Sequence, residues 1–296
     1  MSFPLSGAQL KDRLAALGWR PTAKLGQNFL LDGNLARAIV RDAAVERGDL
    51  VFEVGCGPGM LTGALLDAGA RVLAVEIDPV LAELCGELMG ARGELRIIRG
   101  SVLEKGRLSP EVTEALAGRE FKVVSNLPYS SGTPFLCELA ISELAWRSAT
   151  VMLDAALAAR LASAPRTKTY GAPGVLIGSV AGVRRLRAVP ADVFWPRPRV
   201  ESAILSIEPE AGAPAAGLGE AGRGGRGGRR ELSVFLQGLF SRRRKMLRNA
   251  LPGVPGAAGA EALLEALGLD PRARAEDLSP ADLVRLFAAV RERNPD

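Results

Sequence analysis

The 296-residue chain is long enough for a full α/β domain and a second domain of about 70 to 90 residues. It contains no histidine, which excludes His-based catalytic triads and the commonest metal ligand, so we expect chemistry that depends on positioning. The net charge is +5, but residues 223–251 hold nine Lys and Arg against one Glu, so this stretch carries +8 and the rest of the chain −3. Such a local excess of positive charge predicts contact with a polyanion.

The cysteines and the apolar runs limit the class of protein further. Cys56, Cys85 and Cys137 lie far apart without CxxC spacing, so they indicate neither a disulfide framework nor a zinc site. No apolar run reaches the length of a membrane span, and the first 20 residues lack the features of a signal peptide. The sequence therefore predicts a cytoplasmic protein that binds no metal and no membrane.

The N-terminal part predicts two helices joined by a strap. The first helix covers residues 7–18, where Leu10, Leu14 and Leu17 share one face. The second covers residues 34–44, with Asp32 or Asn34 as its N-cap. Between them, residues 24–32 (KLGQNFLLD) allow two interpretations: a strap packed on the core, or a strap that covers a ligand.

A strand over residues 50–54 runs into the turn GCGPG at 55–59, and a helix follows over 60–68. Glycines at such a turn let the backbone approach a cofactor and leave the N–H groups of the helix free. Met60 stands where a dinucleotide fingerprint needs a small residue, and the GK[ST] of a phosphate loop is missing, so neither an NAD nor an ATP site is supported.

A second strand over residues 71–75 ends in Glu76-Ile77-Asp78, about 20 residues after the glycines. An acidic side chain there can accept hydrogen bonds from two ribose hydroxyls, and the alternative is a solvated acidic turn. Further strands over 94–98, 121–125 and 149–153, with a helix over 134–144, continue the alternation. This order predicts a doubly wound, mostly parallel α/β sheet.

Residues 125–129 (SNLPY) follow the buried strand 121–124, at the strand end where ligands gather in open α/β sheets. The Asn126 carbonyl and a backbone carbonyl held by Pro128 can both accept from one NH₂ group, and Tyr129 offers a π face. That arrangement suits a nucleobase amine. The alternative is an ordinary turn, because Asn and Pro are common turn formers.

Residues 193–199 (VFWPRPR) predict an extended loop that holds Phe194 and Trp195 and presents Arg197 and Arg199. The loop could also merely pin the strand predicted over 201–207. Residues 211–230 are rich in Gly, Ala and Arg and predict a flexible linker; its Arg-Gly-Gly repeats could track RNA, although a solvated tether is favoured.

The remaining residues predict a small helical domain. A helix over 232–250 carries residues 242–245 (RRRK) on its later turns, where they would meet phosphates. Helices over 261–267 and 280–291 complete the domain, with Ser279 capping the last one. The predicted division is residues 1–208, a linker over 209–230, and residues 231–296.

Six segments in order, residues 24–30, 53–59, 76–78, 126–129, 194–203 and 243–249, resemble the KsgA-type rRNA adenine N6-dimethyltransferases. The resemblance covers about residues 24 to 286. It implies a seven-stranded methyltransferase sheet with a smaller C-terminal all-helical RNA-binding domain. It also implies a monomer that uses S-adenosyl-L-methionine to dimethylate two adjacent adenosines near the 3′ end of small-subunit (16S) rRNA during ribosome assembly.

The motifs and this resemblance together give three groups of expected site residues. The catalytic group is Asn126, Leu127, Pro128, Tyr129 and Phe194, with Phe194 opposite Tyr129 around the base. The cofactor-binding group is Asn28, Leu30, Gly55, Gly57, Glu76, Ser101 and Asn126. The RNA-binding group is Arg197, Arg199, Arg242, Arg243, Arg244, Lys245 and Arg248.

The expected mechanism holds the amine with Asn126 and the carbonyl of either Leu127 or Pro128, in line with the sulfonium methyl. After transfer the amine can lose its proton to water, so no strong base is needed.

Two departures from the family favour an alternative. Ser101 stands where the family usually has Asp, which weakens a hydrogen bond to the cofactor's adenine, and DAALA at 154–158 replaces Gln-Lys-Glu-Val-Ala. The alternative is a non-catalytic relative that acts as an rRNA-binding assembly factor or a transcription accessory. The intact residues 126–129 argue against it, because a pure binder has no use for an amine-polarising loop.

Overall fold

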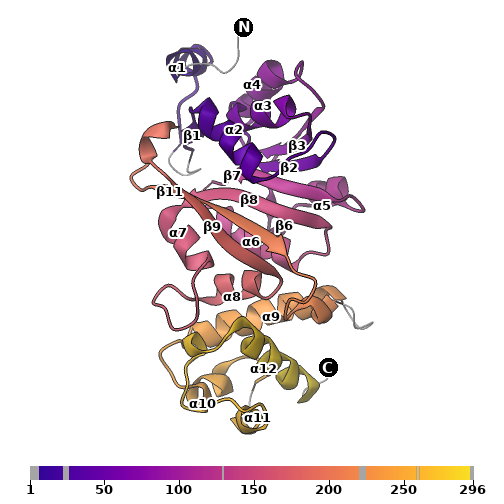
Figure 1. The fold of residues 1–296 in the computed structure, drawn as a ribbon, viewed down its shortest axis with the longest axis vertical. Coiled ribbons are helices and arrows are strands. Elements are labelled where there is room, and N and C mark those ends of the chain that lie inside the picture. The colour runs from indigo at the N-terminus through magenta and orange to yellow at the C-terminus, as the bar shows by residue number, and fades with distance from the viewer. Residues whose placement is uncertain are drawn as a thin grey trace. The chain divides into compact units, whose positions relative to one another are not determined.

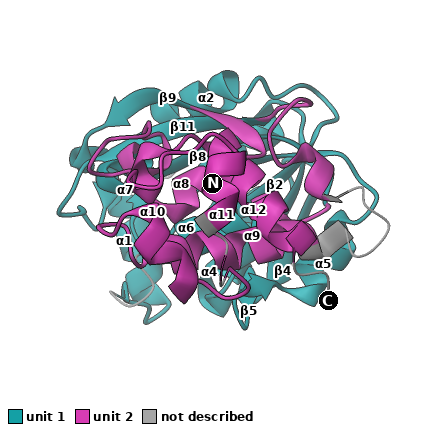
Figure 2. Ribbon diagram, turned by 90° about the horizontal axis from the view of Figure 1, so that it is seen from below, with its two compact units in different colours: residues 1–139, 144–158, 184–208 teal, residues 140–143, 159–183, 209–296 magenta. Residues whose placement is uncertain are grey.

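A computed structural model of the chain describes residues 7–22, 27–128, 130–219, 225–257, 259 and 261–293. Residues 24–26 of the strap motif and the expected catalytic Tyr129 lie outside the described residues. The chain divides into two compact units, coloured teal and magenta in Figure 2. Unit 1 comprises residues 1–139, 144–158 and 184–208, and unit 2 comprises residues 140–143, 159–183 and 209–296.

Strands and helices alternate through unit 1, as the sequence predicts (Figure 1). In chain order the elements that lie in it wholly or largely are α1 (Gly7–Ala16), β1 (Phe29–Leu30), α2 (Gly33–Asp42), β2 (Leu50–Val54), α3 (Met60–Asp67), β3 (Arg71–Glu76), α4 (Pro79–Met89), β4 (Leu95–Arg99), β5 (Leu103–Glu104), β6 (Arg107–Leu108), α5 (Pro110–Leu116), β7 (Phe121–Asn126), α6 (Gly132–Ile141), β8 (Trp146–Asp154), α7 (Ala155–Leu161), β9 (Ala181–Val189), β10 (Phe194–Trp195) and β11 (Ser202–Pro209).

Seven of these strands form one sheet in the order β4-β3-β2-β7-β8-β11-β9. The pairs from β4 through β8 are parallel, and β11 is antiparallel to β8. The expected seven-stranded, mostly parallel, doubly wound sheet is therefore confirmed. Strands β2, β3, β4 and β7 run in the same direction, so their carboxyl ends lie at one edge of the sheet. The last residues of these strands are Val54, Glu76, Arg99 and Asn126.

The interior strand β2 is buried on both faces, which explains why all of its residues except Glu53 are apolar. Val51 lies in a core cluster with residues of α2 and α3, such as Ile39 and Leu65. Its neighbour Phe52 contacts the rings of Phe121 and Phe135, at centroid distances of 6.3 and 6.0 Å. Helices therefore cover both faces of the sheet, and its edge is left to form a site.

Unit 2 contains the C-terminal helices and part of the chain before β9. Its elements are α8 (Ala172–Gly178), a 3₁₀ turn (Ala216–Gly219), α9 (Gly225–Phe240), α10 (Leu247–Ala250), α11 (Glu261–Ala266) and α12 (Pro280–Arg293). The Ser279 hydroxyl accepts from the N–H of Asp282, which confirms the predicted cap of the last helix. None of the helices in the described residues is both long and apolar enough to cross a bilayer.

Unit 1 ends at Glu208, where the sequence predicts a domain boundary, but an earlier segment that was expected in the first domain belongs to unit 2. Residues 159–183 belong to unit 2, where the Tyr170 hydroxyl donates to the carbonyl of Leu278 (3.0 Å) and its ring contacts Phe240. The sequence does not indicate that this segment joins unit 2, because its partners lie far from Tyr170 in the chain.

The predicted flexible linker over 209–230 is wrong in part. Ala213 and Ala215 are buried, and helix α9 begins at Gly225. Gly228 packs so closely on the 3₁₀ turn that a Cβ there would overlap the carbonyl oxygen of Leu218. The glycine-rich composition of this segment predicted a flexible chain. At Gly228, however, the absence of a side chain allows the backbone to pack closely.

The predicted helix over 232–250 is interrupted. Helix α9 ends at Phe240, and residues 241–246 form a turn before α10. In that turn the Arg243 side chain reaches Glu276, and the N–H of Leu247 donates to the carbonyl of Ala273. Tertiary hydrogen bonds thus replace helical ones, and the cations 242–245 lie on a turn rather than on a helix.

Candidate active site

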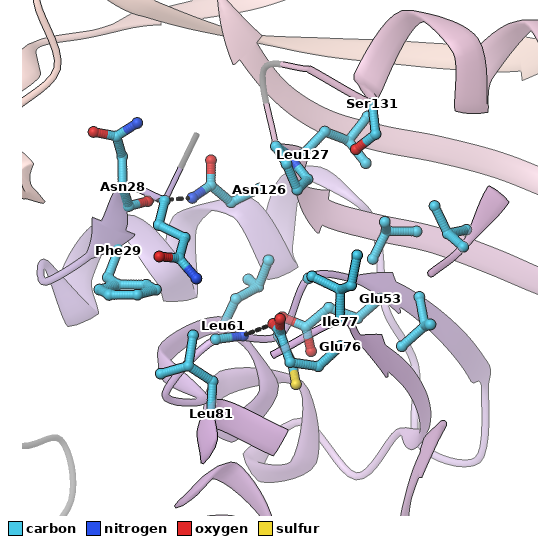
Figure 3. Close-up of a pocket in the computed structure, with 18 of the residues that line it drawn as sticks. Asn28, Phe29, Glu53, Leu61, Glu76, Ile77, Leu81, Asn126, Leu127 and Ser131 are labelled. Carbon is cyan, nitrogen blue, oxygen red and sulfur yellow. Dashed lines mark hydrogen bonds between the residues drawn. The ribbon is translucent and has the colours of Figure 1, made fainter. Parts of the chain in front are cut away.

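A cavity of about 270 Å³ lies at the carboxyl edge of the sheet, where β2, β3, β4 and β7 end (Figure 3). All residues that line it belong to unit 1. They include every expected cofactor-binding residue and three of the expected catalytic residues: Asn28, Leu30, Gly55, Gly57, Glu76, Ser101, Asn126, Leu127 and Pro128. The structure therefore brings together residues that are up to about 100 positions apart in the sequence.

The glycine turn after β2 forms the floor of this cavity. Gly55, Gly57 and Gly59 have φ values of 74°, 53° and 93°, a region that disfavours residues with a side chain. A Cβ at Gly55 would lie 3.2 Å from Pro128, and one at Gly57 would lie 3.0 Å from the ring of Phe29. The glycines thus allow the turn to sit tightly between the Pro128 loop and the strap.

Glu76 ends β3 and is only 5% exposed, so the predicted alternative of a solvated acidic turn is excluded. One carboxylate oxygen accepts from the N–H of Gly57 and the other from the N–H of Asp78, both at 2.9 Å. Burial raises the pKa of Glu76, although these backbone hydrogen bonds counteract the effect. Each oxygen keeps a lone pair for a hydroxyl group in the cavity.

Asn126 ends β7, and its amide group has a defined orientation. Its Nδ2 donates to the backbone carbonyl of Asn28 at 3.0 Å, and its Oδ1 points away from that bond (Figure 3). The preceding Ser125 is fully buried and donates its hydroxyl to the carbonyl of Val54 at 2.7 Å. Ser125 thereby ties the Asn126 loop to the glycine turn, so the two sides of the cavity hold one another in place.

The strap combines both roles that the sequence left open. Phe29 and Leu30 are 7% and 4% exposed, and both also line the cavity. Strand β1 pairs with β10, so Leu30 lies opposite Phe194. At its N-terminal side, Trp19 Nε1 and Gln27 Nε2 both donate to the carboxylate of Asp78. The described part of the strap, residues 27–32, is therefore both packed on the core and part of the cavity wall.

Other residues that line the cavity were not among the expected site residues, and three of them are Glu53, Ile77 and Val102. Ile77 and Val102 follow β3 and β4, and Ile77 is 51% exposed. Glu53 lies within β2, is 2% exposed and accepts from the hydroxyl of Thr62 at 2.7 Å. The signal for Glu53 was present in the sequence, because a single acid inside a buried apolar strand is rarely there without a purpose.

Glu53 makes the stability of the protein depend on pH. Burial raises the pKa of Glu53 from an ordinary 4.5 to about 8, although the hydrogen bond from Thr62 lowers it in part. Between pH 5 and pH 8 the folded chain therefore keeps a proton on Glu53 that the unfolded chain has lost. The free energy of unfolding is thus expected to fall as pH rises through this window, by on the order of a few kcal/mol. Urea titrations from pH 5 to pH 9 without cofactor would measure it, and Glu53→Gln should flatten the curve. Equal slopes for the two proteins would contradict the assignment.

Ser101 lies in the cavity, but its hydroxyl already has local partners. The Oγ donates to the carbonyl of Leu103 at 2.7 Å and accepts from its N–H at 3.3 Å. One acceptor position remains on this oxygen. The other departure, at residues 154–158, begins with Asp154, whose carboxylate accepts from the N–H of Leu157 and so holds the first turn of α7.

Phe194 is not among the residues that line the cavity. It is 4% exposed and belongs to the core cluster that contains Leu30, Val189 and Ile204. The expected position opposite Tyr129 cannot be compared, because Tyr129 lies outside the described residues.

The expected RNA-binding cations differ in their surroundings. In unit 1, Arg197 and Arg199 are exposed. In unit 2, Arg244, Lys245 and Arg248 are exposed, whereas Arg242 and Arg243 are half-buried. Arg243 is held by the carboxylate of Glu276 at 2.6 Å and by the carbonyl of Lys168 at 3.1 Å. Arg243 thus has a structural role. The sequence does not indicate this role, because Arg243 lies in a run of cations that predicts phosphate binding.

No group of three or more Cys, Asp and Glu side chains in the described part of the chain could hold a metal ion. The polar side chains that line the cavity are instead three amides, three serine hydroxyls and two carboxyls, beside backbone groups.

Two solved structures share the fold. A dimethyladenosine transferase from Plasmodium falciparum superposes with a TM-score of 0.72 at 20% identity, covering 90% of this chain and 98% of its own. The 23S rRNA methyltransferase ErmE superposes with a TM-score of 0.59 at 21% identity, covering 88% and 99%. At these identities the likeness establishes the methyltransferase architecture only.

Sequence relatives are more similar. The protein of Nocardia farcinica named Ribosomal RNA small subunit methyltransferase A is 41% identical over 290 residues, which cover 96% of this chain and 94% of that protein. The protein of the same name from Leifsonia xyli subsp. xyli is 40% identical over 292 residues, covering 96% and 98%. The family model of the ribosomal RNA adenine dimethylases matches residues 20–292. The chain therefore belongs to the ribosomal RNA adenine dimethylase family.

Proposed function

We propose that this protein is an S-adenosylmethionine-dependent methyltransferase that dimethylates the N6 amino groups of adenosines in small-subunit rRNA. The observation that carries the proposal is the oriented amide of Asn126 at the rim of a cavity built on a glycine turn. Membership of the family and the names of the relatives support the same activity.

The cavity fits the cofactor in three respects. Its glycine turn lines the cavity without side chains at Gly55 and Gly57, so a ligand can approach the backbone there. Glu76 is positioned to accept two ribose hydroxyls. Ile77 and Val102 supply apolar surface for an adenine ring, beside Ser101 as a neutral acceptor. S-adenosylmethionine supplies an electrophilic methyl group on a sulfonium.

The chain's own contribution is to hold the amine. An exocyclic adenine amine has its lone pair delocalised into the ring, so acceptors that draw its hydrogens out of plane make the nitrogen a better nucleophile. Asn126 Oδ1 is one acceptor, and the hydrogen bond from its Nδ2 to Asn28 fixes which way it points. Preorganisation of this kind lowers the barrier because little reorganisation is needed during the reaction.

The second acceptor is the carbonyl of Leu127. The sequence left Leu127 and Pro128 as equal candidates, but the Pro128 oxygen accepts from the N–H groups of Ser131 and Gly132 at 3.1 and 2.9 Å. Both of its lone pairs are therefore engaged in the first turn of α6. Among the described residues the Leu127 oxygen has no hydrogen-bond donor, so it is the backbone acceptor available to a substrate.

No strong base is required after transfer. The methylated amine carries a positive charge next to an aromatic ring and loses its proton readily to water. The absence of histidine is consistent with this chemistry. The non-catalytic alternative is not favoured, because relatives at about 40% identity are named as methyltransferases.

The substrate is proposed to be rRNA within an assembling small subunit in the cytoplasm. The protein is proposed to act as a monomer.

Incubation with labelled S-adenosylmethionine and unmethylated small subunits tests the proposal. Incorporation should saturate at up to four methyl groups per subunit, with the label recovered as dimethyladenosine. Cofactor binding without any transfer would refute the enzymatic proposal and support a binding role.

The exposed cations of unit 2 are proposed to bind phosphates. Changing Arg244 and Lys245 together to Gln should weaken subunit binding and lower the slope of log affinity against log salt by about 0.7 to 0.9 per phosphate that is no longer neutralised. Filter binding between 50 and 300 mM salt would measure the slope. Arg243→Gln serves as the contrast: it should lower the melting temperature with little change in slope, because Arg243 is bound to Glu276. An unchanged slope in the double variant would show that neither Arg244 nor Lys245 binds a phosphate.

A further inference from the structure

A second cavity, of about 450 Å³, lies at the opposite edge of the sheet in unit 1. It is formed where β2, β3 and β7 begin, together with the residue after the start of β8. Strands of five or six residues separate this edge from the glycine turn by about 15 to 20 Å. We call it the amino-edge basin and define it by its charged lining residues, which are Arg71, Arg119, Lys122, Arg147, Asp49 and Glu120.

The basin has an excess of positive charge. Its four cations face two acids, and one of these acids is already neutralised: Asp49 forms an ion pair with Lys122 at 2.8 Å. Burial would raise the pKa of Asp49, but hydrogen bonds from Lys122 and the backbone of Glu46 and the charges of Lys122 and Arg147 hold it below its ordinary value. Three guanidinium groups then remain against Glu120.

The wall of the basin is fixed by hydrogen bonds. Lys122 Nζ donates to the carbonyl of Ala44 and Arg71 Nε donates to that of Gly48, so both ends of the loop before β2 are anchored. Within the described residues, the side chain of Arg119 makes one long hydrogen bond, of 3.4 Å from Nη1 to the carbonyl of Ala115. A guanidinium held through one nitrogen keeps its remaining N–H groups in a planar fork, which matches the oxygens of a phosphate group.

Glu120 offers little competition for these donors. Its contact with Arg147 measures 3.5 Å, and the two side chains are 71% and 63% exposed. An exposed pair of this kind contributes little, and a phosphate can displace it. The one aromatic residue in the lining, Phe121, is 1% exposed and offers no face on which a base could stack.

We infer that the amino-edge basin binds a phosphate group of the RNA backbone, as a second anchor remote from the methyl-transfer cavity. Phosphate is favoured over a base because the lining supplies guanidinium forks and no exposed ring. An RNA strand is favoured over a small free anion because most of the cations are exposed at the surface rather than enclosed. The inference rests on the proposed function in taking RNA as the substrate.

The test uses the full chain and a fluorescein-labelled transcript of the 3′ domain of small-subunit rRNA. The variant Arg119→Gln with Arg147→Gln removes two cations of the basin and leaves Arg71 and Lys122, which anchor the loop. The matched control, Arg41→Gln with Arg96→Gln, removes two exposed cations of unit 1 that line neither cavity. The basin variant should lower the salt slope by about 0.7 to 0.9, the value for one phosphate that is no longer neutralised, with little change in the control.

Glu120→Gln provides a gain of binding that a misfolded protein could not show. Removing the acid should tighten binding of the transcript several-fold. Equal slopes for the basin variant and its control, or no effect of Glu120→Gln, would overturn the inference. So would saturable binding of inorganic phosphate, lost in the basin variant, with the RNA slope unchanged, because that would identify a site for a small anion.

The failure of this inference and that of the proposed function are distinguishable. Methyl transfer by the wild-type chain with an unaltered RNA slope in the basin variant would reject the basin alone. A reduced slope in the basin variant, with no methyl transfer by the wild-type chain, would reject the proposed function and retain the basin.

Discussion

Replacing Asn126 by Ala is expected to lower the rate of methyl transfer by about 10² to 10³-fold, the loss typical of one preorganised group that stabilises a transition state. The variant removes the Oδ1 acceptor together with the hydrogen bond from Nδ2 to Asn28. Binding of rRNA should change little, since phosphate contacts dominate it. Single-turnover measurements with saturating RNA and cofactor would separate the chemical step from binding.

Asn126→Asp distinguishes the acceptor from its orientation. An aspartate keeps an oxygen at the Oδ1 position but cannot donate to the Asn28 carbonyl, so the side chain loses the hydrogen bond that aims it. We expect an activity between that of the Asn126→Ala variant and that of the wild type, with similar melting temperatures for all three proteins. Full activity of Asn126→Ala would show that the backbone carbonyl of Leu127 suffices, and the role proposed for Asn126 would be withdrawn.

Replacing Phe194 by Ala is expected to lower the free energy of unfolding by about 3 to 5 kcal/mol, as for other buried aromatic residues. The side chain is 4% exposed and packs in the core cluster with Leu30 and Ile204. Because β10 pairs with β1, the loss should also loosen the strap that covers the cavity. Urea unfolding would measure the first effect, and calorimetry of cofactor binding the second.

Phe194→Leu tests whether this residue acts through packing or by stacking on the target base. Leucine retains most of the buried volume and should cost less than about 1.5 kcal/mol, but it has no aromatic face. If packing is the role, Phe194→Leu should methylate rRNA at nearly the wild-type rate. A loss of tenfold or more at an unchanged melting temperature would support the base-stacking role expected from the family resemblance.

Much of the fold follows from short-range signals in the sequence. The apolar run of β2 predicts burial on both faces, and the glycine turn that follows requires backbone angles that side chains disfavour. Asp32 caps α2 because its side chain can reach the N–H groups of Asn34 and Leu35. Each of these signals acts within a few residues, so the sequence alone determines the structure there.

The alternation of strands and helices also predicted the site. Parallel strands place their carboxyl ends at one edge, so the polar residues after β3 and β7 had to converge with the glycine turn. That argument predicts that Glu76 and Asn126 lie at one site, whereas the place of Ser101 in it was implied by the family resemblance. The order of strands and helices does not determine how the Asn126 amide is oriented. It also does not determine whether the carbonyl of Leu127 or that of Pro128 is free to accept a hydrogen bond.

Those details depend on contacts between segments that are distant in the chain, and only the tertiary structure decided them. Pro128 is engaged by the first turn of α6, which leaves the carbonyl of Leu127 as the acceptor. Phe194 is buried because β10 pairs with the strap, and Arg243 is taken by Glu276 rather than left for a phosphate. An aromatic or a cation has the same local pattern whether it faces a ligand or a partner in the fold. The role of such a residue depends on which groups lie next to it in the folded protein. The sequence pattern around the residue does not contain that information.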